Sequence, residues 1–149
     1  MQKRTLKTYL NRNIKDYLKV NCFEFENGYL ITDNYSVIKL NNNYDLQVNE
    51  DKYGVSRIYH DFDMNYNYIQ DLTSYINYDM EEQELNIELE NKRYSMNIKL
   101  IKRIKKLINF DKVELLSTYS MFVNEYNYVI KLTNTKTNEV AYLLPMKVY

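Results

Sequence analysis

Apolar side chains near the start of the chain recur at steps of three and four residues: Leu6, Tyr9, Leu10, Ile14, Tyr17 and Leu18. This spacing puts them on one face of a helix, so the pattern predicts a helix over residues 3–19. The same spacing returns in Ile98, Ile101, Ile104 and Ile108 and predicts a second helix over residues 98–108. Each predicted helix has one face suited to packing against a sheet.

Short apolar groups around these helices predict strands. After the first helix they fall at residues 22–25, 29–32 and 37–40, and Asn27-Gly28 joins the first two as a hairpin. Around the second helix they fall at residues 85–89, 113–116, 119–123, 128–132 and 140–148. The order helix then strands therefore occurs twice, in halves of about residues 3–60 and 84–149.

Residues 41–83 form an irregular segment, in which Asn and Asp interrupt the apolar groups. We expect loops there, with an extended stretch at residues 53–59 and a short helical turn around residues 68–76. Since the chain has 2 Gly and 1 Pro, Asn and Asp must turn most of its loops.

Length and composition favour one α+β domain over residues 1–149, with two basic helices packed on an antiparallel sheet. A chain of 149 residues is the usual size of a single domain, and hydrophobic residues make up 45% of it. No apolar run approaches the roughly 20 residues that cross a bilayer, so we expect a cytoplasmic protein with no membrane partner. Cys22 is the single cysteine, which excludes an internal disulfide.

The charge distribution carries the main functional signal. The net charge is zero, yet the two predicted helices hold 11 of the 20 basic residues and 1 of the 20 acidic residues. In the second helix the cations lie opposite the isoleucine stripe: Lys99, Lys102, Arg103 and Lys106. The first helix adds Arg4, Lys7, Arg12 and Lys15. Side by side on a sheet, these faces would form a positive surface for the phosphates of duplex DNA.

The alternative interpretation of these cations is two ordinary solvated helix faces. Solvated faces usually mix Glu with Lys, because oppositely charged pairs stabilise a helix. The near absence of acids therefore favours DNA binding.

Candidate catalytic chemistry is sparse. His60 is the only imidazole, and a metal site at residues 60–63 would lack any further His or Cys ligand. A surface acidic loop is the commoner interpretation of such a segment, as it is for the acidic residues 79–84. We therefore expect no enzyme activity, no cofactor and no metal.

Two segments resemble the beta sliding clamps of bacterial DNA polymerase III, the ring-shaped processivity factors of replication. Residues 27–37 resemble the clamp strand that ends in Thr-Asp-Gly, here with Asn34 in place of Gly, and residues 141–148 resemble the closing strand. Residues 94–116 are similar to the second helix of a clamp domain and its following strand. The resemblance implies helices that line a hole through which duplex DNA passes.

The same resemblance implies a pocket for short peptides of polymerases and other clients. Its matching positions are Thr32, Asn34 and Val37 on one side, and Leu144, Pro145 and Met146 on the other. In the family these two groups belong to adjacent domains. Taken singly, each residue also fits a hairpin turn or a core strand.

Clamp subunits contain three such domains, whereas this chain has the length of one, so a closed ring would need a homo-oligomer of about six copies. The predicted function is a clamp-like DNA-binding or processivity factor that ignores base sequence. The alternative is a small interaction protein, such as a phage inhibitor, that binds and blocks a host replication or defence complex through an exposed sheet edge.

Overall fold

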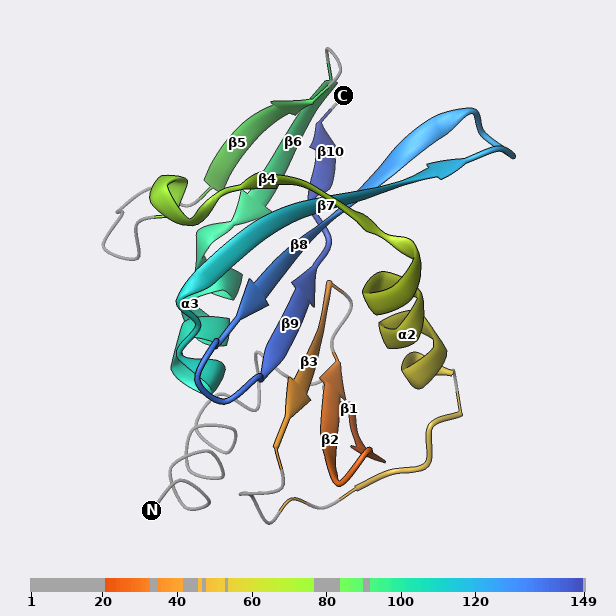
Figure 1. Ribbon diagram of the computed structural model, residues 1–149, viewed down its shortest axis with the longest axis vertical. Helices are drawn as coiled ribbons and strands as arrows, with labels where there is room; N and C mark the ends of the chain where they lie inside the picture. Colours follow the sequence, from red (N-terminus) through yellow and green to blue (C-terminus); the bar gives the residue numbers. More distant parts are fainter. Residues whose placement is uncertain are drawn as a thin grey trace.

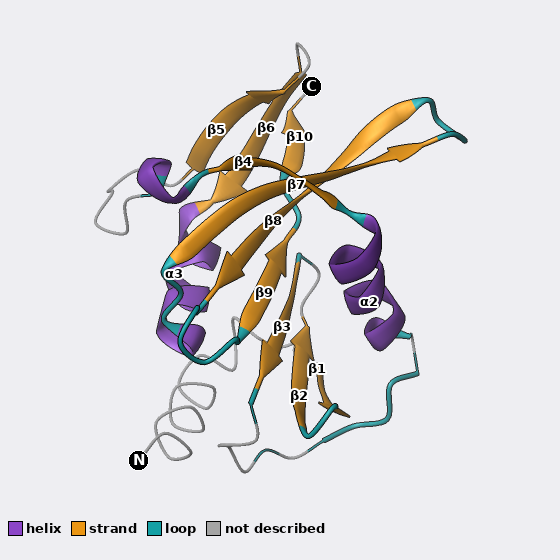
Figure 2. Cartoon of the chain, viewed as in Figure 1, coloured by secondary structure: helices purple, strands orange, loops and turns teal. Residues whose placement is uncertain are grey.

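The computed structural model describes residues 21–32, 35–41, 46, 48–52, 54–76, 84–89 and 92–148 (Figures 1 and 2). The predicted helix over residues 3–19 lies outside these described residues. So do Arg4, Lys7, Arg12 and Lys15, and the acidic residues 79–83. The fold is α+β, as the sequence predicted, with helices on antiparallel sheet. Of the two predicted basic helices the described residues include the second, whereas the other described α-helix, at residues 55–65, was not predicted.

Two antiparallel sheets form the described framework. Its strands are β1 (Asn21–Phe25), β2 (Gly28–Thr32), β3 (Ser36–Leu40), β4 (Asn67–Asp71), β5 (Glu84–Leu89), β6 (Lys92–Asn97), β7 (Lys112–Ser120), β8 (Glu125–Thr133), β9 (Val140–Leu143) and β10 (Met146–Val148). The larger sheet has the order β1-β2-β3-β9-β8-β7-β4, and the smaller sheet has the order β10-β6-β5. Because β3 pairs with β9, strands of the two predicted halves share one sheet.

The described α-helices, α2 (Val55–Asn65) and α3 (Ile98–Ile108), are associated with different sides of the larger sheet (Figure 1). Adjacent strand residues alternate between two cores, as Leu30 and Ile31 do in β2. The α3-side core includes Ile31, Ile38, Ile98, Ile101, Ile104, Leu107, Ile108, Phe110, Leu115, Ile130, Leu132 and Leu143. The α2-side core contains Phe23, Phe25, Leu30, Val37, Val55, Tyr59, Phe62, Leu116, Val129, Val140 and Tyr142.

The β1–β2 hairpin turns one residue earlier than its sequence predicted. Glu26 and Asn27 have positive φ angles of 44° and 62°, and Gly28 already pairs with Phe25 as the first residue of β2. Gly28 is required not by the turn but by its closeness to the neighbouring strand. A Cβ atom there would stand 2.1 Å from the carbonyl oxygen of Leu40 on β3, so only Gly permits this approach.

Asparagine occupies the left-handed position in several other turns, as the shortage of Gly and Pro predicted. Among the described residues, Asn109, Asn124 and Asn138 also have positive φ angles. Asn tolerates this left-handed backbone better than most side chains do.

The segment at residues 41–83 contains more regular structure than its sequence predicted. The stretch expected to be extended, residues 53–59, instead enters α2 at Val55, and β4 occupies the start of the predicted helical turn. Only Thr73–Tyr75, a short 3-10 helix, matches that turn. In α2, Val55, Tyr59 and Phe62 are buried, and this aromatic packing overrides the weak local pattern.

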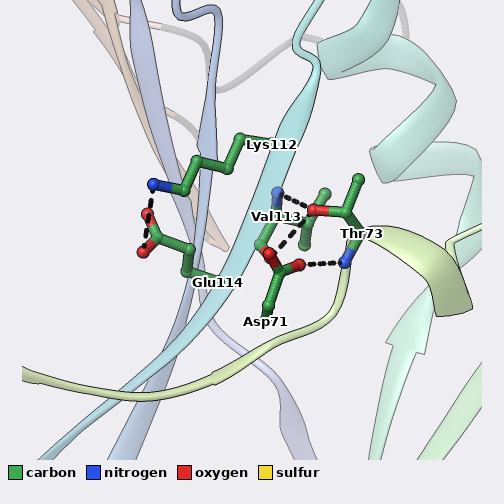
Figure 3. A network of polar contacts seen from close by, with 5 residues as sticks. All are labelled: Asp71, Thr73, Lys112, Val113 and Glu114. Carbon is green, nitrogen blue, oxygen red and sulfur yellow. Dashed lines mark hydrogen bonds and ion pairs between the residues drawn. The ribbon is translucent and has the colours of Figure 1, made fainter.

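A polar network fixes the end of β4 against β7 (Figure 3). The carboxylate of Asp71 accepts a hydrogen bond of 2.7 Å from the backbone N–H of Thr73. The Thr73 hydroxyl accepts one of 2.9 Å from the N–H of Val113, and the N–H of Leu72 donates to the carbonyl of Val113 at 2.8 Å. The side-chain and backbone hydrogen bonds from Thr73 lower the pKa of Asp71. Beside this network, Lys112 lies 3.7 Å from Glu114.

The second half of the chain needs three corrections. Residues 119–123 were expected to be a strand, but β7 continues to Ser120 and a turn follows before β8 begins at Glu125. The strand expected over residues 140–148 is divided into β9 and β10 at Leu144 and Pro145. Strand β6 was not predicted. It joins β5 to β10 in the smaller sheet.

Candidate functional site

Helix α3 is held by caps at both ends. The side chain of Asn97 accepts a 2.8 Å hydrogen bond from the N–H of Lys99, which satisfies a donor at the first turn. At the other end Asn109 adopts a left-handed conformation, and its N–H donates to the carbonyl of Lys105 at 2.9 Å. The predicted bounds of this helix, residues 98–108, are confirmed.

One face of α3 is buried and the opposite face is cationic. Ile98, Ile101, Ile104, Leu107 and Ile108 pack into the α3-side core. Lys99, Lys102 and Lys106 are exposed and Arg103 is half-buried. These four residues, defined here as the cationic face of α3, are the DNA-binding candidates that the structure describes. No acidic residue occurs in the helix, so its own sequence supplies no internal ion pair.

Lys105 was not a DNA-binding candidate, and its position supports leaving it out. Its ammonium donates to the carbonyl of Phe110 and lies 5.0 Å from the centre of the Phe110 ring. This cation therefore stabilises the carboxyl-terminal end of α3, where positive charge is favourable.

The two segments of the proposed peptide pocket lie next to each other in this single chain. Thr32 pairs with Val37 across the β2–β3 turn, and the N–H of Leu144 donates to the carbonyl of Tyr35 at 2.9 Å. Val37, however, points into the α2-side core and is only 6% exposed. Pro145 and Met146 follow Leu144 into β10, and Asn34 lies outside the described residues.

A pocket of about 110 Å³ does lie beside Leu144, between the two sheets. Its lining comes from Tyr35, Ser95, Met96, Asn97, Leu100, Leu143 and Leu144. We call it the Leu144 pocket. Of the proposed residues whose side chains the structure describes, Leu144 alone lines it, and the other lining residues come from Tyr35 before β3, from β6, from α3 and from β9. Sequence reasoning did not connect β6 or α3 to this site.

A run of three exposed apolar residues forms a second feature that sequence reasoning missed. Met121, Phe122 and Val123 lie in the turn between β7 and β8, and Phe122 is fully exposed. We call these three residues the hairpin tip. Their apolar run was interpreted as part of a strand, because periodicity alone does not distinguish a short buried segment from an exposed apolar turn.

The segment around His60 is helical rather than the acidic loop that the sequence suggested. His60 packs against the rings of Phe25 and Tyr59, with centroids 5.3 Å and 6.1 Å away. Asp61 accepts a 2.8 Å hydrogen bond from Asn65, and Asp63 accepts one of 3.4 Å from the Tyr142 hydroxyl. Over the described residues, no three His, Cys, Asp or Glu side chains gather in a way that could hold a metal ion.

Comparisons of the chain with protein-family models, with curated proteins and with solved structures found no match. The sliding-clamp resemblance therefore remains a prediction from the sequence. Among the helices that the structure describes, none is long and apolar enough to cross a membrane.

Proposed function

We propose that this protein binds duplex DNA without sequence preference, as a clamp-like factor, through the cationic face of α3. The observation that supports this proposal is a helix whose one side is buried in the α3-side core while its other side displays Lys99, Lys102, Arg103 and Lys106. Because the buried side fixes the helix, the cations are presented on a firm surface and lose little further backbone entropy on binding.

The spacing of the cations fits a phosphate backbone. From Lys99 to Lys106 the helix rises by about 10 Å, at roughly 1.5 Å per residue. A DNA strand carries a charge about every 3.4 Å along the duplex axis, so the face spans about three phosphate intervals, which correspond to about four phosphates of one strand. Four phosphate contacts would make the affinity fall with salt at a log–log slope of about −3.6.

The test compares two triple charge reversals with the same change in net charge. One variant carries Lys99→Glu, Lys102→Glu and Lys106→Glu on α3. The matched control carries Lys52→Glu, Arg57→Glu and Arg93→Glu, three exposed cations outside α3. Fluorescence anisotropy with a labelled duplex of mixed sequence would measure both affinities at several salt concentrations.

We expect the α3 variant to lose at least about tenfold in affinity and most of its salt dependence, since each lost phosphate contact removes about 0.9 from the slope. The control should stay within about threefold of the unmodified protein, because distant charges act only through a screened field. Equal losses in both variants would mean that net charge, and not α3, governs binding. Wild-type protein that binds no DNA would contradict the proposal altogether.

The second candidate function, binding to a host complex, is favoured by strand β4. This strand ends the larger sheet, and all five of its residues are exposed, including Tyr68 at 58% and Ile69 at 51%. An edge strand of this kind can pair with a strand of another protein. Titration calorimetry with a purified bacterial sliding clamp would test it. Binding that is lost in Ile69→Lys but kept in the α3 variant would support this function, and no binding would contradict it.

A further inference from the structure

The β7–β8 hairpin extends beyond its neighbours in the larger sheet (Figure 1). The last β4 pair on β7 is Asn67 with Ser117, whereas β7 and β8 stay paired as far as Ser120 with Glu125. At about 3.3 Å per residue, the turn begins roughly 13 Å beyond Ser117. The hairpin tip thus stands away from both cores, with Met121 86% exposed and Phe122 102% exposed.

The hairpin is braced in this extended position. Tyr119 and Tyr126 pack edge to face with ring centroids 5.1 Å apart, and Tyr128 packs in the same way on Tyr94 of β6 at 5.4 Å. Lys92 of β6 forms a 2.9 Å ion pair with Glu125. A braced hairpin holds three apolar side chains in water, where each is unfavourable, and such a patch marks an interaction site.

The Leu144 pocket has the size and polarity to receive one such side chain. A cavity of about 150 Å³ can hold a benzene ring, and this pocket of about 110 Å³ is partly open, so one aromatic ring can enter most of the way. Met96 and Leu143 are buried at its floor, and Leu144 at its rim is 42% exposed. Its lining residues include no charged side chain.

We infer that Phe122 of one copy docks into the Leu144 pocket of a second copy of this chain. The single chain carries both an exposed aromatic projection and an uncharged, mainly apolar recess that can take most of one ring. Residues 118–124 contain no charge, so the contact desolvates no unpaired ion on either side. The same lack of cations disfavours an anionic lipid surface or DNA as the occupant of the tip.

This contact joins two different surfaces, so an open chain of copies keeps one unused tip at one end and one unused pocket at the other until a ring closes. Repeated head-to-tail contacts of this type produce rings when the rotation closes and filaments when it does not. The pocket is lined by Asn97 and Leu100, which flank Lys99, but by none of the four residues of the cationic face. Substitutions at Phe122 and Leu144 therefore test self-association without changing the cations proposed to bind DNA.

The experiment uses sedimentation velocity of the full chain with two single variants, Phe122→Ser at the tip and Leu144→Arg at the pocket rim. Met64→Ser is the matched control, because Met64 is a 74% exposed apolar residue on α2. We expect the wild-type protein and Met64→Ser to form concentration-dependent oligomers. Each of the other variants alone should self-associate at least about thirtyfold more weakly, as expected for loss of a central anchor.

Mixing the two defective variants gives the decisive result. Phe122→Ser retains a pocket and Leu144→Arg retains a tip, so an equimolar mixture should form a dimer of two 18.2 kDa chains and nothing larger. Circular dichroism of each variant confirms folding beforehand. A wild-type protein that stays monomeric would overturn the inference. A mixture that associates no better than the single variants would overturn it too, because that result indicates tip-to-tip contact or no contact at this site.

Discussion

The two sides of the larger sheet are built on different chemistry. On the α3 side, an aliphatic stripe of isoleucine and leucine buries one face of the helix and leaves a cationic face outside. On the α2 side the packing is aromatic: Tyr142 lies between Tyr59 and Phe62, with ring centroids 5.4 Å and 5.3 Å away. The outer residues of α2 include both Arg57 and Asp61, so that side has no comparable charge pattern.

This difference suggests a division of roles. A helix whose polar face carries one sign of charge is suited to binding an oppositely charged partner. The aromatic packing of α2 instead covers the opposite face of the sheet, where Val55, Tyr59 and Phe62 close over Leu30 and Tyr142. The proposed DNA binding therefore falls on the α3 side, and we expect α2 to support the sheet.

The largest expected effect comes from truncating one core residue on each side. Phe62→Ala in α2 should lower the free energy of unfolding by about 3–5 kcal/mol, and Ile104→Ala in α3 by about 2–5 kcal/mol, because both leave a cavity. Urea denaturation followed by circular dichroism and by tyrosine fluorescence would measure both values. The exposed substitutions Met64→Ala and Lys99→Ala should change stability by less than about 0.5 kcal/mol.

The same measurement tests whether the two sides unfold together. Both cores share the strands of one sheet, so the two spectroscopic signals should give one transition in every variant. A separate early transition in Phe62→Ala would show instead that α2 detaches from a sheet that remains folded.

The sequence predicted the α3 side far better than the α2 side, and the reason is physical. Four isoleucines at helical spacing among lysines give strong contrast, so the limits of α3 could be located to the residue. Helix α2 is preceded by Gly54 in a left-handed conformation and buries Val55 and Tyr59, residue types that are also typical of strands. Its helical state depends on contacts with Phe25 and Tyr142, which are distant in the sequence.

The candidate sites also differ in how far the sequence could predict them. The cationic face of α3 follows from spacing within one helix, so the sequence alone could identify it. The Leu144 pocket combines Tyr35 before β3 with residues of β6, β9 and α3, and no local pattern shows that these segments meet. The hairpin tip was misassigned because β7 and β8 are longer than their apolar cores, which places an apolar run outside the sheet.

An intermediate effect is expected at the helix caps, which also differ between the two sides. Asp51 accepts hydrogen bonds of 2.7 Å and 3.0 Å from the N–H groups of Val55 and Ser56 at the start of α2. Asn97 caps α3 with one neutral bond. Asp51→Ala and Asn97→Ala should each cost about 0.5–2 kcal/mol in urea denaturation near neutral pH.

Low pH should weaken the stabilising effect of the Asp51 cap but not that of the Asn97 cap. Desolvation raises the pKa of Asp51, but the backbone hydrogen bonds from Ser56 and Val55 outweigh it, and the net pKa lies below the ordinary 3.8. A lowered pKa contributes stability above the unfolded value, and that stability is lost as pH falls through the folded value. The cost of Asp51→Ala should therefore shrink in acid, whereas the cost of Asn97→Ala should not. A parallel response of both variants would contradict this assignment.

The smallest expected effect concerns Cys22, which packs against the α3-side core from β1. Burial raises the pKa of its thiol from 9.0 to about 11. A raised pKa contributes stability that is present below the unfolded value and is lost as pH rises through the folded value. Because the thiol is partly exposed, we expect Cys22 to account for less than about 1 kcal/mol of the loss of stability between about pH 8 and pH 10.

Cys22→Ala would isolate this contribution, since the variant should lose less stability than the wild-type protein over the same alkaline range. Alkylation by iodoacetamide gives an independent measurement. The thiolate is the reactive form, so near pH 8 the folded protein should react at least about tenfold more slowly than the protein unfolded in urea. Equal rates in the two states would place Cys22 in water rather than against the α3-side core. If alkylation is slow but Cys22→Ala loses as much stability at alkaline pH as the wild-type protein, then limited access of the reagent, and not the pKa of the thiol, protects Cys22.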